Sequence, residues 1–155
     1  MCVTTAKGLG NGVTIGACRA KGAAAKTCVP GTHGSTFGGN PLATASALAV
    51  IETIETKHLG ERVTHLGATM KSAFESALAD NPAVVEIRGC GLMLGIQLDR
   101  PCAQLVSDAL DNGLLINVTA GSVIRLLPPF ILSDVEAEQI ASTVVQLINK
   151  FTTAA

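Results

Sequence analysis

Between residues 59 and 79, apolar residues recur at steps of three and four. They are Leu59, Val63, Leu66, Met70, Phe74 and Leu78. This spacing predicts a long amphipathic helix whose apolar stripe faces a core. Asp80, Asn81 and Pro82 follow directly and predict the end of that helix.

Four short apolar segments after this helix predict strands. Segments 84–88 and 92–98 flank the sequence GCG and predict a tight antiparallel pair. Segments 114–118 and 122–127 predict two further short strands.

Two more helices are predicted in the C-terminal half. One begins at Pro101 and ends at Gly113. Its expected inward positions are Leu105, Val106, Ala109 and Leu110. The other begins at a capping box formed by Ser133 and Glu136 and runs to about Phe151. Its expected inward positions are Val135, Ile140, Val144 and Ile148. These elements together predict a compact α/β domain with a small, largely antiparallel sheet covered by helices.

The first forty residues are rich in glycine. Segments 2–6 and 13–18 predict two short strands, with Lys7 on the turn between them. Residues 19–27 predict a brief helix or a loop. Residues 30–40 read PGTHGSTFGGN, which predicts a loop because proline and glycine exclude the interior of a regular element.

A helix is predicted directly after this loop. Asn40 is the expected N-cap, Pro41 takes the first helical position, and the helix runs to about Glu55. It is apolar nearly all round, so it is expected to be buried. Its N-terminal dipole is expected to point toward Ser35 and Thr36, which suits an anion there.

Length and charge narrow the function classes. The chain has 155 residues, 48% of them hydrophobic, which is enough for a packed core. A net charge of -1 with 15% charged residues provides no basic patch for nucleic acid, so small molecules or protein surfaces are the expected partners. There is neither a basic, apolar leader nor an apolar stretch of about 18 residues, so we expect a cytoplasmic protein without a membrane span.

The cysteines and histidines do not predict a metal site. Five cysteines stand at irregular separations without a CxxC pair, and the expectation is buried free thiols in a reducing compartment. His58 and His65 lie two helical turns apart, too far for these two residues alone to bridge one metal ion.

Lys7, Ser35, Thr36 and Arg125 are the candidates for chemistry. Lys7 is either a solvated surface charge or a desolvated amine that can form a Schiff base. Ser35 and Thr36 belong to an ordinary turn that caps the next helix, or they form a phosphate pocket with free backbone N–H groups. Arg125 lies in VIRLLPP at an expected inward strand position, where it needs a carboxylate partner such as an internal salt bridge. Neither GxGxxG nor GxxxxGK[ST] is present.

Three sequence runs resemble one known family. They are TTAKGLGNGVTIGA, PGTHGSTFGGNPLATASALAVIE and EIRGCGLMLGIQL. In this order they resemble the C-terminal part of class III aminotransferases, which depend on pyridoxal phosphate, and within that class the acetylornithine type. The resemblance implies the C-terminal part of the fold type I architecture. Residues 1–58 would be the end of the large-domain sheet, and residues 59–155 a bridging helix and a small α/β domain.

The resemblance also implies roles for the candidate residues. Lys7 would hold pyridoxal phosphate as a Schiff base, and Thr36 would bind the cofactor phosphate across a homodimer interface. Ser35 would contact the substrate, and Arg125 would bind its carboxylate. The implied reaction moves the terminal amino group of N-acetylornithine to 2-oxoglutarate in arginine biosynthesis.

Other functions remain open at this point. The family's acidic partner for the pyridine nitrogen and its stacking aromatic residue precede the lysine by more residues than this chain has there, so little activity of the chain alone is expected. Alternatives are a non-catalytic dimerising or scaffolding module, and an enzyme whose missing half is encoded separately. The amino donor could instead be ornithine, 4-aminobutyrate or succinyl-diaminopimelate.

Overall fold

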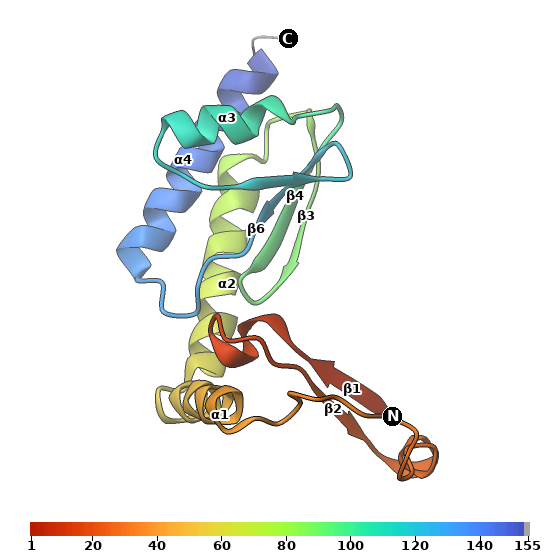
Figure 1. Cartoon of the computed structure of the whole chain (residues 1–155). Coiled ribbons are helices and arrows are strands. Elements are labelled where there is room, and N and C mark those ends of the chain that lie inside the picture. The colour runs from red at the N-terminus through yellow and green to blue at the C-terminus, as the bar shows by residue number, and fades with distance from the viewer. Residues whose placement is uncertain (154–155) are drawn as a thin grey trace. The chain divides into compact units, whose positions relative to one another are not determined.

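The computed structural model describes residues 1–153 (Figure 1). The chain divides into two compact units, Met1–His58 and Leu59–Ala155. Each unit is considered separately below.

The second unit contains a four-stranded antiparallel sheet in the order β3-β4-β6-β5. The strands are β3 (Val84–Cys90), β4 (Met93–Leu98), β5 (Asn117–Thr119) and β6 (Val123–Leu126). The predicted hairpin is confirmed, and β3 extends two residues further than predicted. Gly91 turns the chain between β3 and β4 with a positive φ of 54°, a conformation that favours glycine. The expected small, mainly antiparallel sheet is therefore present.

Three helices form the core of this unit with the sheet. They are α2 (Leu59–Ala77), α3 (Gln104–Asp111) and α4 (Asp134–Thr153). The predicted stripe of α2 is confirmed, because Leu66, Met70 and Phe74 are all buried. Strand β4 presents Leu94, Ile96 and Leu98 to the same core, following the alternation of a strand with one covered face. Contacts of α2 with β3, β4 and α4 complete this packing.

The capping box of α4 is confirmed. The Ser133 N–H and hydroxyl both donate to Glu136 Oε2 at 2.8 and 2.7 Å, and the Glu136 N–H donates to Ser133 Oγ at 3.2 Å. The predicted inward position of Val135 is wrong, since this side chain is 73% exposed. It belongs to the first turn, whereas the stripe that packs on the core begins at Ala137.

Helix α3 is shorter than predicted and buries a narrower face. Leu105 and Ala109, one helical turn apart, are buried together with Cys102. The predicted inward positions of Val106 and Leu110 are wrong, because both are exposed on a helix of only eight residues. Gly113 follows the helix with a positive φ, as its predicted end requires.

The first unit contains a two-stranded antiparallel sheet of β1 (Cys2–Thr5) and β2 (Ala17–Ala20). Two 3₁₀ helices, η1 (Lys7–Gly10) and η2 (Gly22–Lys26), follow these strands in turn. The second strand begins later than its predicted start at residue 13. Ile15 instead packs against Gly10, with its Cγ2 atom 2.8 Å from where a Cβ on that glycine would lie. Residues 30–40 form a loop, as predicted.

Helix α1 (Pro41–Thr56) follows this loop. Its predicted cap is confirmed, since Asn40 Oδ1 accepts the Ala43 N–H at 3.0 Å. The prediction that this helix is buried is wrong for the chain on its own, because Leu42 is 73% and Leu48 56% exposed. Within the first unit, η1 is the element that packs against α1, so the remaining apolar faces stay uncovered.

The cysteines also differ from expectation. Cys102 is buried, but Cys2, Cys18, Cys28 and Cys90 are exposed, so the prediction of buried thiols holds for one of the five. Three of the exposed thiols lie in the first unit, which has too few packed elements to cover them. Among residues 1–153, no helix is long and apolar enough to cross a membrane.

Candidate functional site

Lys7 opens the tight turn η1 directly after β1. Its φ is +49°, in the left-handed region that residues other than glycine rarely adopt. Asn11, which ends the same turn, has a φ of +46°, and its N–H donates to the Gly8 carbonyl at 3.1 Å. Asparagine adopts this region readily, so Lys7 is the uncommon residue of the turn, and backbone outliers of this kind cluster at functional sites.

Helix α1 holds this turn in place. The Ser46 hydroxyl donates to the Gly10 carbonyl at 2.7 Å, and Gly10 is the buried residue of the turn. A Cβ on Gly10 would overlap Ile15, so the backbone passes here only because glycine has no side chain. Ser46 was missed by sequence reasoning, because its contact joins residues 36 positions apart and no local pattern indicates it.

Ser35 and Thr36 lie on the loop that enters α1, and both are exposed. Asn40 ties this loop to the helix, because its Nδ2 donates to the Phe37 carbonyl at 3.0 Å while its Oδ1 caps α1. A Cβ on Gly38 would lie 3.0 Å from Ser35 Cβ, so the loop folds closely on itself. Ser35 and Thr36 precede the N-cap residue Asn40 by five and four residues, and a helix N-terminus favours an anion.

The same helix thus anchors both candidate segments. Ser46, which holds the Lys7 turn, is five residues after Pro41, or about 7.5 Å along the helix axis at about 1.5 Å per residue. The loop of Ser35 and Thr36 joins the helix at Asn40. The first unit consequently brings an amine-bearing turn and a hydroxyl-bearing loop onto one support.

The structure does not bury Lys7. The sequence left open whether Lys7 is a solvated surface charge or a desolvated amine; Lys7 is exposed, so the described residues of this chain do not remove it from water. The first unit therefore holds the Lys7 turn in position, but it does not shield the Lys7 amine from water.

Arg125 lies on the outer face of the sheet in the second unit. Its strand neighbours Ile124 and Leu126 are buried, and Arg125 itself is exposed, opposite Gly95 on β4 and Asn117 on β5. The predicted inward position is therefore wrong, because the alternation of the strand points this residue away from the core. Within residues 1–153 the ion pairs involve other side chains, so the internal salt bridge is also absent.

A second arginine shares this outer row. Arg88 on β3 is also opposite Gly95, from the other side. Its Nη1 donates to Glu86 Oε2 at 2.5 Å and to Gln97 Oε1 at 2.9 Å. Arg88 is thus held by its own partners, whereas the side-chain hydrogen bonds and ion pairs found among residues 1–153 do not include the guanidinium of Arg125.

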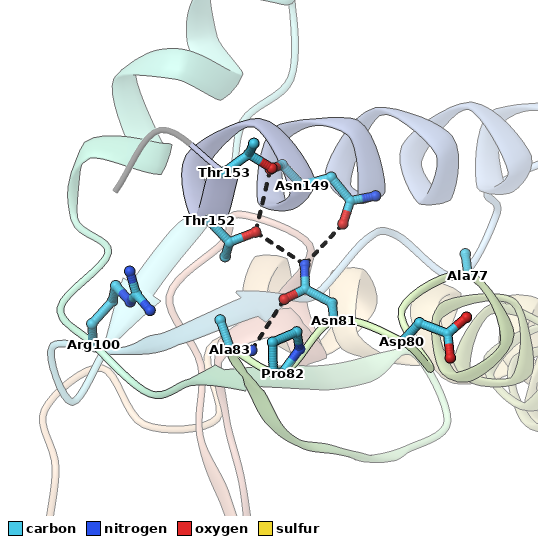
Figure 2. Close-up of a pocket in the computed structure, with 9 residues that line it drawn as sticks. All are labelled: Ala77, Asp80, Asn81, Pro82, Ala83, Arg100, Asn149, Thr152 and Thr153. Carbon is cyan, nitrogen blue, oxygen red and sulfur yellow. Dashed lines mark hydrogen bonds between the residues drawn. The ribbon is translucent and has the colours of Figure 1, made fainter.

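A surface pocket of the second unit lies away from Arg125. It has a volume of about 390 Å³ and is lined by the ends of α2 and α4 together with Arg100 (Figure 2). Asn81 spans it, with Nδ2 donating to Asn149 Oδ1 at 2.8 Å and to Thr152 Oγ1 at 3.0 Å. It contains none of the candidate residues. Among residues 1–153, no group of three or more His, Cys, Asp or Glu side chains is placed to hold a metal ion.

Comparison with known proteins identifies the family of this chain. Residues 2–148 match the family described as Aminotransferase class-III. Acetylornithine aminotransferase 1 from Bordetella pertussis is 54% identical over 149 residues, which are 96% of this chain and 38% of that protein. Acetylornithine aminotransferase from Nitrosomonas europaea is 46% identical over the same shares of the two chains.

Solved structures show the same fold. The ornithine aminotransferase from Toxoplasma gondii superposes with a TM-score of 0.90 at 30% identity, covering 99% of this chain and 38% of that one. Acetylornithine aminotransferase from Elizabethkingia anophelis gives a TM-score of 0.86 at 29% identity, covering 96% and 40%. A further Toxoplasma gondii structure, at 31% identity, is described with partial occupancy of PLP at its active site.

The chain spans about 38% of the length of these curated relatives. Its α/β units match the fold of aminotransferases that depend on pyridoxal phosphate. A match over nearly the whole chain decides the family: the chain belongs to the class-III aminotransferases.

Proposed function

We propose that this chain is the C-terminal portion of a transaminase that transfers the terminal amino group of N-acetylornithine to 2-oxoglutarate. Lys7 is the residue that holds pyridoxal phosphate in this proposal. The observation that carries it is the strained Lys7 turn, bound to the same helix as the Ser35–Thr36 loop, in a chain that matches class-III aminotransferases. Residues 1–58 are then the end of the large cofactor domain, and residues 59–155 the bridging helix and small domain.

The residues present fit the chemistry of this cofactor. An aldehyde needs a primary amine, which Lys7 provides at an exposed position on a fixed turn. A phosphate needs hydrogen-bond donors at a site that favours negative charge, and Thr36 provides one beside the N-terminus of α1. When bound, pyridoxal phosphate supplies an electron sink for the carbanion formed on the substrate.

The chain's own residues have separate tasks in the reaction. Lys7 would hold the cofactor through its Nζ atom and, once free, would carry a proton as a general base and acid. Thr36 Oγ1 donates to a phosphate oxygen, serving the partner subunit of a homodimer, and Ser35 Oγ positions the acylated substrate. Arg125 binds a substrate carboxylate through its paired N–H groups.

The names of the relatives support the choice of substrate. Sequence relatives with 41–54% identity are named acetylornithine aminotransferases. In this proposal the reaction belongs to arginine biosynthesis and takes place in the cytoplasm. The structural relatives include ornithine aminotransferases, so ornithine is the first alternative donor, followed by 4-aminobutyrate and succinyl-diaminopimelate.

We expect little turnover from the 155 residues alone. They span about 38% of the relatives' length, and they leave Lys7 exposed. An acidic partner for the pyridine nitrogen and an aromatic ring to stack on it are required for efficient chemistry in this class. A turnover rate from this chain by itself near that of a complete transaminase would contradict this expectation.

Reductive labelling tests the role of Lys7. Pyridoxal phosphate and borohydride are added to the chain, followed by tryptic mapping. A label on Lys7 blocks cleavage there, so peptide 1–19 appears in place of 1–7 and 8–19. The expected label is on Lys7, and the Lys21→Arg and Lys26→Arg variants, altered at two other lysines of the first unit, should leave it unchanged. Equal labelling of the three lysines would refute the proposal.

The support from α1 provides a second readout. Ser46→Ala removes the hydrogen bond that holds the Lys7 turn, and we expect it to lower labelling of Lys7 relative to Lys26. Ser72→Ala, which removes a hydroxyl from the other unit, is the matched control. Substrate choice is tested separately on the assembled enzyme by comparing N-acetylornithine, ornithine and 4-aminobutyrate as donors at equal concentration.

A non-catalytic scaffold is the second candidate function. The exposed apolar residues of α1, Leu42 and Leu48, favour it because they leave an uncovered face suited to another chain. Sedimentation of the purified chain distinguishes the cases when combined with the labelling. A stable dimer without selective labelling of Lys7 would favour the scaffold, or a site completed by a separately encoded half.

A further inference from the structure

Two cysteines of the first unit face each other across its small sheet. Cys2 lies on β1 and Cys18 on β2, and their sulfur atoms are 3.3 Å apart. Both side chains are exposed. The proposed transamination uses neither of them, so this contact needs an explanation of its own.

The strand register explains why the thiols meet. Cys2 is opposite Ala20, and Cys18 is opposite Thr4, so the two cysteines are diagonal neighbours on one face of an antiparallel pair. Diagonal positions lie within reach of longer side chains. A disulfide bond is about 2.0 Å long, so the sulfurs need to approach by only about 1.3 Å beyond their present contact. Strands of four residues with exposed side chains can make this adjustment.

We propose that Cys2 and Cys18 form a thiol–disulfide exchange site that takes small-molecule disulfides such as oxidised glutathione. One cysteine, as the thiolate, attacks a sulfur of the small disulfide, forms a mixed disulfide and releases one glutathione thiolate. The other cysteine loses its proton and attacks the sulfur of the first, releasing the second glutathione. Two electrons and the two thiol protons pass to the small disulfide, which becomes two thiols, and the chain gains one Cys2–Cys18 bond.

This bond would enclose the candidate cofactor turn. The loop from Cys2 to Cys18 contains all of η1 and therefore Lys7. In the reduced chain, β1 and β2 are held by backbone pairing along four residues each and by the non-covalent contact of the two thiols. The cross-link restrains the strands that lead into and out of the strained turn, and it does so without modifying Lys7.

Cys28 is the natural control for this proposal. It is a third exposed thiol of the same unit. Cys28 is ten residues from Cys18 along the chain, whereas Cys2 is sixteen residues from Cys18. In an unfolded chain the shorter loop closes more readily, so random oxidation would favour Cys18–Cys28. A preference for Cys2–Cys18 can therefore come only from the folded contact between β1 and β2.

The test uses oxidised glutathione on the native chain, followed by intact mass and non-reducing tryptic mapping. We expect loss of two hydrogens and a disulfide-linked pair of peptides, 1–7 with 8–19, which separates on reduction. Cys28→Ser should leave this product unchanged. In the Cys28→Ser background, Cys2→Ser should remove it and leave a stable glutathione adduct on Cys18, because the first unit then has no second thiol to resolve the mixed disulfide.

The same oxidation in guanidinium chloride provides the comparison with the unfolded chain. There the linked pair should change to peptides 8–19 and 27–57, which contain Cys18 and Cys28. The proposal is overturned if the native chain gives this second pair. It is equally overturned if native Cys2 and Cys18 accumulate separate glutathione adducts without a cross-link. Neither outcome depends on whether Lys7 binds a cofactor.

Discussion

Replacing Gly67 by alanine should disrupt the packing of α2 on the β3–β4 hairpin. Gly67 lies in the buried face of α2, directly under the hairpin turn. A Cβ built there would lie 2.1 Å from the Gly91 carbonyl oxygen and 2.4 Å from its carbon. These are backbone atoms, which cannot rotate away as a flexible side chain can, so either the helix or the hairpin must move.

Two opposing effects set the size of the change. Alanine is favoured over glycine inside a helix by about 1 kcal/mol. Overpacking a well-filled core costs about 1–3 kcal/mol, and a clash with backbone belongs at the upper end of this range. We therefore expect Gly67→Ala to lower the free energy of unfolding by about 2 kcal/mol. For a domain of about 60–100 residues, this corresponds to a fall in Tm of about 8–16 °C.

Thermal unfolding followed by circular dichroism measures this change, and Gly60→Ala is the matched control. Gly60 lies on the same helix, and a Cβ there would meet nothing within 4 Å. That variant should retain or slightly raise Tm, because alanine gains helix propensity without a clash. If Gly67→Ala unfolds within about 2 °C of the parent chain, the close approach of α2 and the hairpin is refuted.

Three further predictions concern single side chains. Asn40→Ala removes the cap of α1 and should cost about 1 kcal/mol, measured as faster amide exchange of the Ala43 region. The Ser133 hydroxyl and N–H donate to Glu136 and hold the pKa of this carboxyl below its usual range. The contribution of this carboxylate to folding stability is therefore complete above the unfolded pKa of about 4.3 and is lost as pH falls through the folded pKa. Glu136→Gln should flatten the acid limb of a plot of Tm against pH. Burial raises the pKa of the Cys102 thiol. The contribution of this thiol to folding stability is therefore complete below the unfolded pKa of about 8.5 and is lost as pH rises through the folded pKa. A Cys102→Ala variant that still shows the full alkaline loss of stability would contradict this assignment.

The candidate site illustrates the limits of reasoning from sequence. The Lys7 turn and the Ser35–Thr36 loop were identified from their glycine content and family resemblance, and the structure shows that one helix supports both. The contact that holds the turn, from Ser46, joins residues 36 positions apart, and no local pattern indicates such a pairing. The exposure of Lys7 likewise depends on which segments cover it.

By itself, the sequence determined the elements with strong periodicity: the stripe of α2, the β3–β4 hairpin, and the capping box that starts α4. Each depends on residues within about one or two turns, or on a short loop, so local chemistry suffices.

Only the tertiary structure decided which faces are covered. Arg125 points away from the core, most of α1 is exposed, and Cys2 meets Cys18. Burial and register depend on neighbours that are distant in sequence, and a one-residue change of strand phase reverses the side on which a side chain lies. The exposure of Arg125, the exposure of α1 and the Cys2–Cys18 contact share one physical reason. Local sequence preferences allow several packing arrangements, and contacts between residues distant in sequence select one of them.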